Sequence, residues 1–205
     1  MADGPFRLAV KKIAVVVEGP SDEVFWEKVL NREFAHRCRF KVIKQNGRSN
    51  VIAAASDLAE SLRGAGYSAV FFVVDLDDDP CFEIVKNLFS ANVQATASEP
   101  VEQRFAHLCI ARREFESWLL ADAAGIRAAL PNVDYVCAEI TDSRSGKPHL
   151  KRLIYADRGP GASFREPAFA REMAPHFSPL NAVQWSPSFA HFWGRMTAVV
   201  ERLSQ

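Results

Sequence analysis

Residues 70–80 read VFFVVDLDDDP, an apolar run that passes directly into a row of acids. The β-branched and aromatic residues of this run are typical of a strand that is buried on both faces of a parallel sheet. Asp75 and Asp77 follow at the carboxyl end of the expected strand. Because ligands bind along that edge of an open parallel sheet, the segment predicts a site as well as a strand.

A second strand end has the same arrangement. Residues 15–22 read VVVEGPSD, in which Glu18 directly follows the apolar run and Gly19 permits a tight turn. The segment after Glu18 is typical of a turn before a helix, and either Ser21 or Asp22 could cap that helix. Glu18 could therefore bind a metal or move a proton, or it could be a solvated acid in a capping loop.

The rest of the chain alternates between expected strands and helices. Strands are expected at residues 12–17, 38–44, 69–74 and 105–111, and helices at 23–34, 51–63, 80–89, 117–122 and 123–130, with a loop at 92–103. This alternation predicts an α/β fold, an open parallel sheet with helices on both faces.

The pattern weakens after residue 130. We therefore predict an α/β domain over residues 1–130 and a C-terminal extension over 131–205 that packs on the same domain. The extension should contain a loop or insertion at 141–166, which is rich in Gly, Pro, Ser and Arg, and two closing helices at 166–175 and 187–203.

Composition limits the possible functions. The 205 residues carry no net charge, so binding to nucleic acid would need a local basic patch. The four cysteines lack paired spacing, which argues against a zinc site or a disulfide framework. Neither a signal peptide nor an apolar stretch of membrane-spanning length is visible, so we expect a soluble, cytoplasmic protein with no membrane contact.

The acids after residue 74 suggest a metal site. Asp75 and Asp77 would point the same way in an extended chain, so both could face one ion, and Mg²⁺ prefers oxygen ligands. Asp78 and Asp79 add charge that repels unless a cation neutralises it. The alternative is an acidic turn that caps the next helix, where the helix dipole favours negative charge.

A third acidic element follows the expected strand at 105–111. If Glu114 or Glu116 turns toward the same edge, a second metal becomes possible. Two-metal sites stabilise both the attacking and the leaving oxygen in phosphodiester cleavage. The alternative is that both glutamates cap and solvate the helix that bears Trp118.

Basic residues gather in the loop-rich region. They include Arg144, Lys147, Lys151 and Arg152, which could contact phosphate groups of a nucleic acid or belong to a solvated, flexible loop. The chain lacks the Gly-rich Lys-Ser/Thr signature of a nucleotide-binding ATPase, and no Ser-His-Asp or Cys-His arrangement can be assembled.

Together the three acidic elements resemble a Toprim domain. That family carries a Glu-Gly turn after its first strand and an Asp-x-Asp after its third, here Glu18-Gly19 and Asp75-Leu76-Asp77. Residues 18–22 are similar to those of overcoming-lysogenization-defect (OLD) nucleases and related phage-defence Toprim proteins. The segments RREFESWLLAD at 112–122 and SPSFAHF at 186–192 resemble a small, uncharacterised bacterial family of Toprim-like proteins.

The resemblance implies a nuclease that cleaves DNA or RNA with Mg²⁺ or Mn²⁺. Asp75 and Asp77 would bind the metal, Glu18 would bind metal or act as the general acid/base, and Asp22 and Glu116 would be further ligands. Relatives of this kind are often encoded beside an ATPase, so an ATPase partner and a role in phage defence are expected.

Two alternatives stay open. The first is a non-catalytic docking or regulatory subunit of an ATPase complex. The second is a phosphatase or nucleotide-processing enzyme that uses the same metal site. The chain has no fused ATPase and no tyrosine-bearing domain, so topoisomerase and primase functions would lack their other half.

Overall fold

The computed structural model describes residues 10–77, 82–93 and 104–205. The predicted contributions of Asp78, Asp79 and Pro80, and nearly all of the predicted loop at 92–103, lie outside these residues. In the described part of the chain, no helix is long and apolar enough to cross a membrane.

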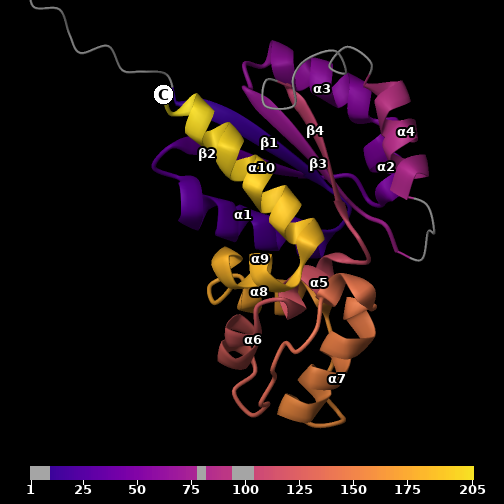
Figure 1. Cartoon of the computed structure of the whole chain (residues 1–205), viewed down its shortest axis with the longest axis vertical. Coiled ribbons are helices and arrows are strands. Elements are labelled where there is room, and N and C mark those ends of the chain that lie inside the picture. The colour runs from indigo at the N-terminus through magenta and orange to yellow at the C-terminus, as the bar shows by residue number, and fades with distance from the viewer. Residues whose placement is uncertain (1–9, 78–81, 94–103) are drawn as a thin grey trace, which may run out of the picture.

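Four strands form one sheet (Figure 1): β1 Lys11–Val17, β2 Cys38–Lys44, β3 Ala69–Asp75 and β4 Ala106–Ala111. All neighbouring pairs are parallel and the order is β2-β1-β3-β4, which confirms the predicted open parallel sheet. The chain goes from β1 to β2 on one side and then crosses to β3 on the other. The carboxyl ends of β1 and β3 therefore flank the topological switch point, where open α/β sheets bind ligands.

Helices cover both faces of the sheet, as predicted. Their bounds are α1 Pro20–Phe34, α2 Arg48–Ala53, α3 Ala55–Gly64, α4 Phe82–Asn92, α5 Phe115–Leu120, α6 Ala123–Ala129, α7 Gly146–Arg158, α8 Glu166–Met173, α9 Pro179–Trp185 and α10 Pro187–Leu203, with a short 3₁₀ helix η3 at Thr141–Ser143. Helices α1 and α10 cover one face and α2, α3 and α4 the other. Figure 1 shows α5 to α9 beyond the carboxyl ends of the strands.

The strands are buried on both sides because alternate residues enter two cores. Val15 and Phe71 pack with the aromatic side chains of α1 and α10, among them Trp26. Val16 and Phe72 pack with residues of α2, α3 and α4. This explains why the strands read as continuous apolar runs in the sequence.

The structure corrects the prediction of a loop at residues 141–166. This region contains η3 and the 13-residue helix α7, whose buried residues Leu150 and Ile154 lie four apart on one face. Pro148 is compatible with the first turn of a helix, and Gly159 ends α7 at a φ of 89°. The Gly and Pro residues that suggested a loop therefore mark the two ends of a helix.

Other expected elements also differ. The first helix begins at Pro20 with Gly19 as its N-cap, and no side chain caps it, so the prediction that Ser21 or Asp22 would cap it is wrong. The expected helix at 51–63 is two helices, α2 and α3, which meet at Ala54. Helix α9 was not predicted.

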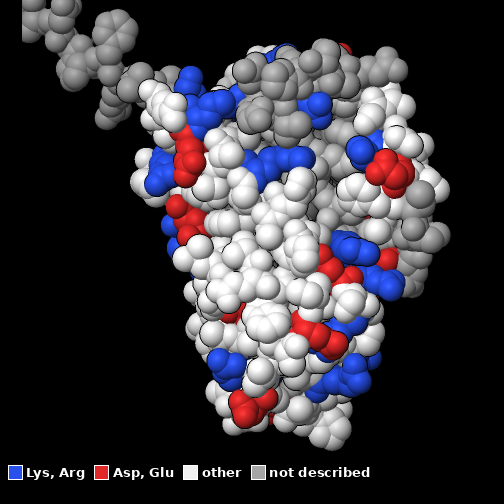
Figure 2. All heavy atoms as spheres, in the orientation of Figure 1, with Lys and Arg blue, Asp and Glu red and all other residues white. Residues whose placement is uncertain are grey.

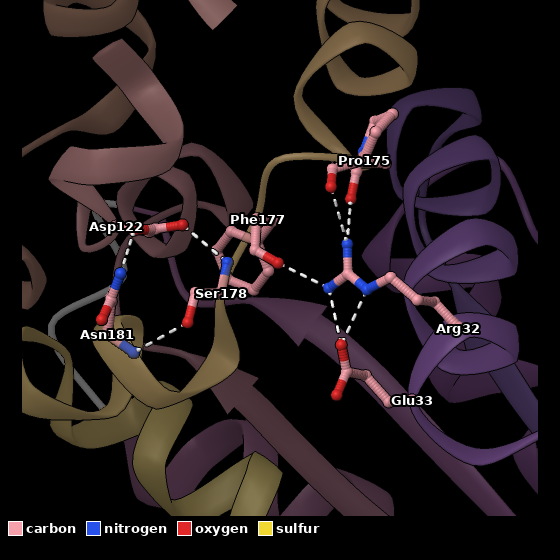
Figure 3. Close-up of polar contacts among 8 residues, drawn as sticks. Arg32, Glu33, Asp122, Pro175, Phe177, Ser178 and Asn181 are labelled. Atoms are coloured by element: carbon pink, nitrogen blue, oxygen red, sulfur yellow. Dashed lines mark hydrogen bonds and ion pairs between the residues drawn. The ribbon is translucent and has the colours of Figure 1, made fainter. Parts of the chain in front are cut away.

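Polar contacts fasten the C-terminal helices to the rest of the chain (Figure 3). Asp122 is fully buried as the N-cap of α6, and its carboxylate accepts hydrogen bonds from Gly125 N, Ser178 N and Asn181 Nδ2. Arg32 of α1 donates to the carbonyl oxygens of residues 174, 175 and 177. The boundary proposed at residue 130 stays a prediction.

Candidate functional site

Glu18 and Asp75 lie at the switch point, at the carboxyl ends of β1 and β3. The backbone N–H of Asp75 donates to Glu18 Oε1 at 2.7 Å, and the N–H of Phe115 donates to Asp75 Oδ1 at 3.0 Å. Each carboxylate is thus oriented by the backbone of the next element, β3 for Glu18 and α5 for Asp75. One oxygen of each carboxylate is left out of these bonds.

Asp22 and Glu116 extend this acidic group. Asp22 lies in the first turn of α1 and Glu116 in the first turn of α5, where its side chain is buried. Gly19 makes room for Asp22, since a Cβ at this position would lie 3.1 Å from Asp22 Oδ2. With Glu18, Asp75 and Lys147, these two acids line a depression of about 490 Å³, which we call the acidic depression.

Burial and mutual repulsion shape the charge of the four acids. Burial raises the pKa of Asp22 to about 7, with a further contribution from the charge of Glu18. Burial likewise raises the pKa of Glu116 to about 8 and that of Glu18 above its usual value. Burial, together with the charges of Asp22, Glu18 and Glu116, raises the pKa of Asp75 well above its usual value. The charge of each of the other three acids therefore acts on Asp75. The group would ionise more easily beside a cation.

Lys147 is a basic residue that lines the acidic depression beside these acids. Burial lowers its pKa, but the charges of Glu116, Glu166 and Asp75 outweigh this and raise the pKa above its usual value. Its Nζ lies 3.8 Å from Glu166 Oε2. The ammonium group is therefore held charged at the wall of the acidic depression.

The start of α7 positions Lys147. Glu114 accepts hydrogen bonds from Ser145 Oγ at 3.0 Å and from the backbone N–H of Lys147 at 2.8 Å. Gly146 packs so closely on α5 that a Cβ there would overlap Ser117 N and the carbonyl carbon of Glu116. The sequence left the roles of Glu114 and Glu116 open. The structure gives Glu114 a bond that fastens α7 and places Glu116 among the acids.

Asp77 departs from the extended geometry that we expected. Its φ of 53° is left-handed, so the chain turns directly after β3 and the side chain is 54% exposed. Arg48 holds this turn by donating to the carbonyl oxygens of Asp75 and Leu76, and its Nη1 lies 3.9 Å from Asp77 Oδ2. The charge of Asp77 still raises the pKa of Glu18 and of Asp75.

Of the four predicted phosphate contacts, Lys147 alone lines the acidic depression among the described residues. Arg144 pairs with Glu139 at 2.6 Å. Lys151 lies over the ring of Tyr155, and Arg152 Nε donates to the carbonyl oxygen of Pro148. Lys147, Lys151 and Arg152 lie on helix α7 and not in a loop, and the contact of the four residues with phosphate groups stays a prediction.

Sequence reasoning missed several residues of the site. Asn46 and Gly47 line the depression with φ values of 59° and 111°. Their Asn-Gly dipeptide, which suits left-handed backbone, was a usable signal. Glu166 is brought to Lys147 by the fold across the whole length of α7, and no local pattern marks it.

Comparison with known proteins identifies the family. The family model described as "Domain of unknown function (DUF4276)" matches residues 17–197. The chain belongs to the DUF4276 family. No curated protein sequence matches this DUF4276 chain.

Solved structures share the fold of this DUF4276 protein. The C-terminal region of the Burkholderia pseudomallei OLD protein has a TM-score of 0.51 and 13% identity, over 93% of this chain and 98% of that one. The C-terminal region of the Xanthomonas campestris pv. campestris OLD protein has a TM-score of 0.49 and 15% identity, over 95% of this chain and 98% of that one. At these identities the likeness concerns the fold.

The residues of the DUF4276 site suit a hard divalent cation by their chemistry. The four acids offer carboxylate oxygens, and Glu116 Oε2 is buried without a hydrogen-bond partner among the described residues. Within the described ranges, no three His, Cys, Asp or Glu side chains already form a group that could hold a metal. Binding therefore calls for rotation of these side chains.

Proposed function

We propose that this DUF4276 protein is a metal-dependent phosphodiester hydrolase of the Toprim type that cleaves nucleic acid. The observation that carries the proposal is the group of Glu18, Asp22, Asp75 and Glu116, which four elements (β1, α1, β3 and α5) bring to the switch point beside Lys147. The fold shared with the C-terminal region of the Burkholderia pseudomallei OLD protein is consistent with it.

The acids would hold Mg²⁺ or Mn²⁺. Asp75 would be the central ligand, since its pKa responds to all three neighbouring acids, with Glu18, Asp22 and Glu116 around it. Asp77 would join them only after its exposed side chain turns inward. When bound, a divalent cation supplies Lewis-acid stabilisation of the phosphodiester oxygens and lowers the pKa of water.

Lys147 and Glu18 would stabilise the phosphate group and move the proton. The charged ammonium group of Lys147 would contact a phosphate oxygen and offset the charge that develops on it. As an alternative to binding the metal, Glu18 would take up the proton of the attacking water, since the N–H of Asp75 fixes its carboxylate at the switch point. Both groups are oriented before substrate arrives, Glu18 by the N–H of Asp75 and Lys147 by Glu114.

Cleavage of labelled single-stranded and double-stranded DNA and RNA, in Mn²⁺, Mg²⁺ or EDTA, tests the proposal. We expect cleavage in metal, none in EDTA, and a loss of at least about 100-fold in Asp75→Asn. Asp134→Asn makes the same charge change at an exposed position and should cleave like the wild type. Wild-type rates from a folded Asp75→Asn variant would contradict the proposal.

The same experiment separates the alternatives. Faster hydrolysis of small phosphate esters than of any polymer would indicate a phosphatase or a nucleotide-processing enzyme. Metal binding without hydrolysis of either substrate, together with a stable ATPase partner recovered by affinity purification, would indicate a docking or regulatory subunit. A partner that switches on cleavage would instead support a two-component nuclease.

A further inference from the structure

A second, larger hollow lies along the outer edge of β4. Helix α4 forms one wall, and α10 with η3 forms the other, around a volume of about 1310 Å³. The described residues that line it are all different from those of the acidic depression, but Asp77, two residues after Asp75, lines its near end. Figure 2 shows this face, with basic side chains between α10 and α4 and acidic side chains among them. We call it the β4 groove.

The β4 groove concentrates positive charge, although the whole chain has a net charge of zero. Among the described residues, its lining contains five Lys and Arg residues against two Asp: Lys86, Arg104, Arg112, Arg113 and Arg195 against Asp77 and Asp142. Arg104 precedes β4 and Arg112 and Arg113 follow it, and a six-residue strand is roughly 20 Å long. Charge spread over that length suits a polyanion better than a single phosphate group.

Apolar side chains line the same surface. Phe82 of α4 is 47% exposed and Ile140 beside η3 is 42% exposed, and both line the β4 groove. Phe89 and Ile110 contribute further apolar surface. Cations beside exposed aromatic and apolar side chains are typical of surfaces that bind single-stranded nucleic acid, because unpaired bases offer flat faces for stacking.

The edge of β4 is poorly suited to an added peptide strand. The carbonyl oxygen of Leu108 already accepts a hydrogen bond from Arg195 Nη1 at 3.0 Å. The N–H of Arg112 donates to Ser188 Oγ at 3.4 Å. Two backbone groups that a peptide would need for strand pairing are therefore engaged, which argues against an acidic peptide bound by β-augmentation.

His107 adds an unpaired polar group to the wall of the groove. It is 2% exposed, its ring stacks on Phe71 with centroids 4.6 Å apart, and neither ring nitrogen has a hydrogen-bond partner among the described residues. Burial, with the charges of Arg195 and Arg202, lowers its pKa to about 4. The neutral ring therefore keeps one donor and one acceptor.

We propose that the β4 groove binds single-stranded DNA or RNA and leads it past Asp77 to the acidic depression. The binding itself follows from the cations, the exposed aromatic side chain and the engaged strand edge. That the bound nucleic acid runs toward the acidic depression rests on the proposed nuclease function. The predicted contacts on α7 would then be secondary to those of the groove.

Fluorescence anisotropy with a labelled oligothymidine of about 20 nucleotides, in EDTA over a range of salt concentrations, tests the proposal. The variant Lys86→Glu/Arg112→Glu reverses two exposed charges of the groove, and Lys151→Glu/Arg152→Glu reverses two exposed charges on α7. We expect the groove variant to bind at least about 10-fold more weakly and to lower the salt slope by about 1.4, at about 0.7 per phosphate contact. The α7 variant should bind within about twofold of the wild type.

Equal binding by the two variants, or tighter binding of duplex than of single strand, would overturn the proposal. Displacement of the oligonucleotide by polyglutamate of equal charge would also overturn it, in favour of an acidic protein partner. Because EDTA removes the metal, these results do not depend on the acidic depression. If the wild-type protein binds oligonucleotide through the groove but binds no metal, the proposed nuclease function is overturned and the proposal for the groove is kept.

Discussion

The carboxylate of Glu18 accepts a hydrogen bond from the backbone N–H of Asp75, at 2.7 Å. The two residues are separated by 57 positions in the sequence, and the pairing of β1 with β3 brings them together. The bond crosses the switch point, so the orientation of the first acid depends on the strand that carries the second.

This bond predicts different behaviour for two substitutions of Glu18. Glu18→Gln keeps an acceptor oxygen for the Asp75 N–H, whereas Glu18→Ala leaves that part-buried donor unpaired. We expect Glu18→Ala to be less stable than Glu18→Gln by about 1 kcal/mol in urea unfolding, and both to lose Mn²⁺ affinity. Equal stability of the two variants would mean that the bond does not orient Glu18.

The acidic group predicts how pH acts on the metal-free protein. The pKa values of Asp22 and Glu116 rise from 3.8 to about 7 and from 4.5 to about 8, so the folded state holds protons that the unfolded state releases. Their contribution to stability is complete below about pH 4 and is lost as pH rises toward 8. At about 1.4 kcal/mol per pKa unit, we expect the free energy of unfolding in EDTA to fall by on the order of 6 kcal/mol between pH 5 and 8.5.

Urea unfolding at the two pH values measures this loss. Saturating Mn²⁺ should reduce it, because a cation favours the ionised carboxylates. Glu116→Gln should weaken the pH dependence, since it removes one of the two groups. A protein that becomes more stable in EDTA as pH rises over this range would contradict the electrostatic account.

Gly146 predicts a link between backbone packing and the placement of Lys147. In Gly146→Ala the new Cβ would overlap the backbone of Glu116 and Ser117, so α7 must shift. We expect a loss of about 1–3 kcal/mol in the free energy of unfolding, and weaker cleavage if Lys147 acts on the phosphate. Gly194→Ala in α10 meets no atom within 4 Å, so this control should gain up to about 1 kcal/mol.

His107 predicts sensitivity to acid. Burial lowers its pKa to about 4 from its usual 6.5, so the unfolded state takes up a proton before the folded state does. The stability contribution of the neutral ring is present above pH 6.5 and is lost as pH falls toward 4. His107→Phe keeps an aromatic ring on Phe71. Between pH 6.5 and 4, the free energy of unfolding of this variant should fall by about 2–3 kcal/mol less than that of the wild type. Identical pH profiles for the two proteins would show that His107 is not held neutral.

The sequence was most informative where the chemistry is local. The apolar runs before Glu18 and Asp75 predicted both strands and the edge where the acids meet. The sequence did not predict helix α7, because Gly146 and Pro148 are common in loops as well as at the start of a helix. The turn at Asp77 and the approach of Glu166 to Lys147 depend on distant contacts, to Arg48 and across α7, which no local pattern contains.

Calorimetric titration of Mn²⁺ into the purified protein, beside Asp75→Asn and Asp134→Asn, tests the central claim most directly, since it needs neither a substrate nor a partner. We predict saturable binding to the wild type and to Asp134→Asn, and none to an Asp75→Asn variant with an unchanged circular dichroism spectrum. Absence of binding to the wild type, or undiminished binding to Asp75→Asn, would contradict the assignment of the acidic depression as a metal site.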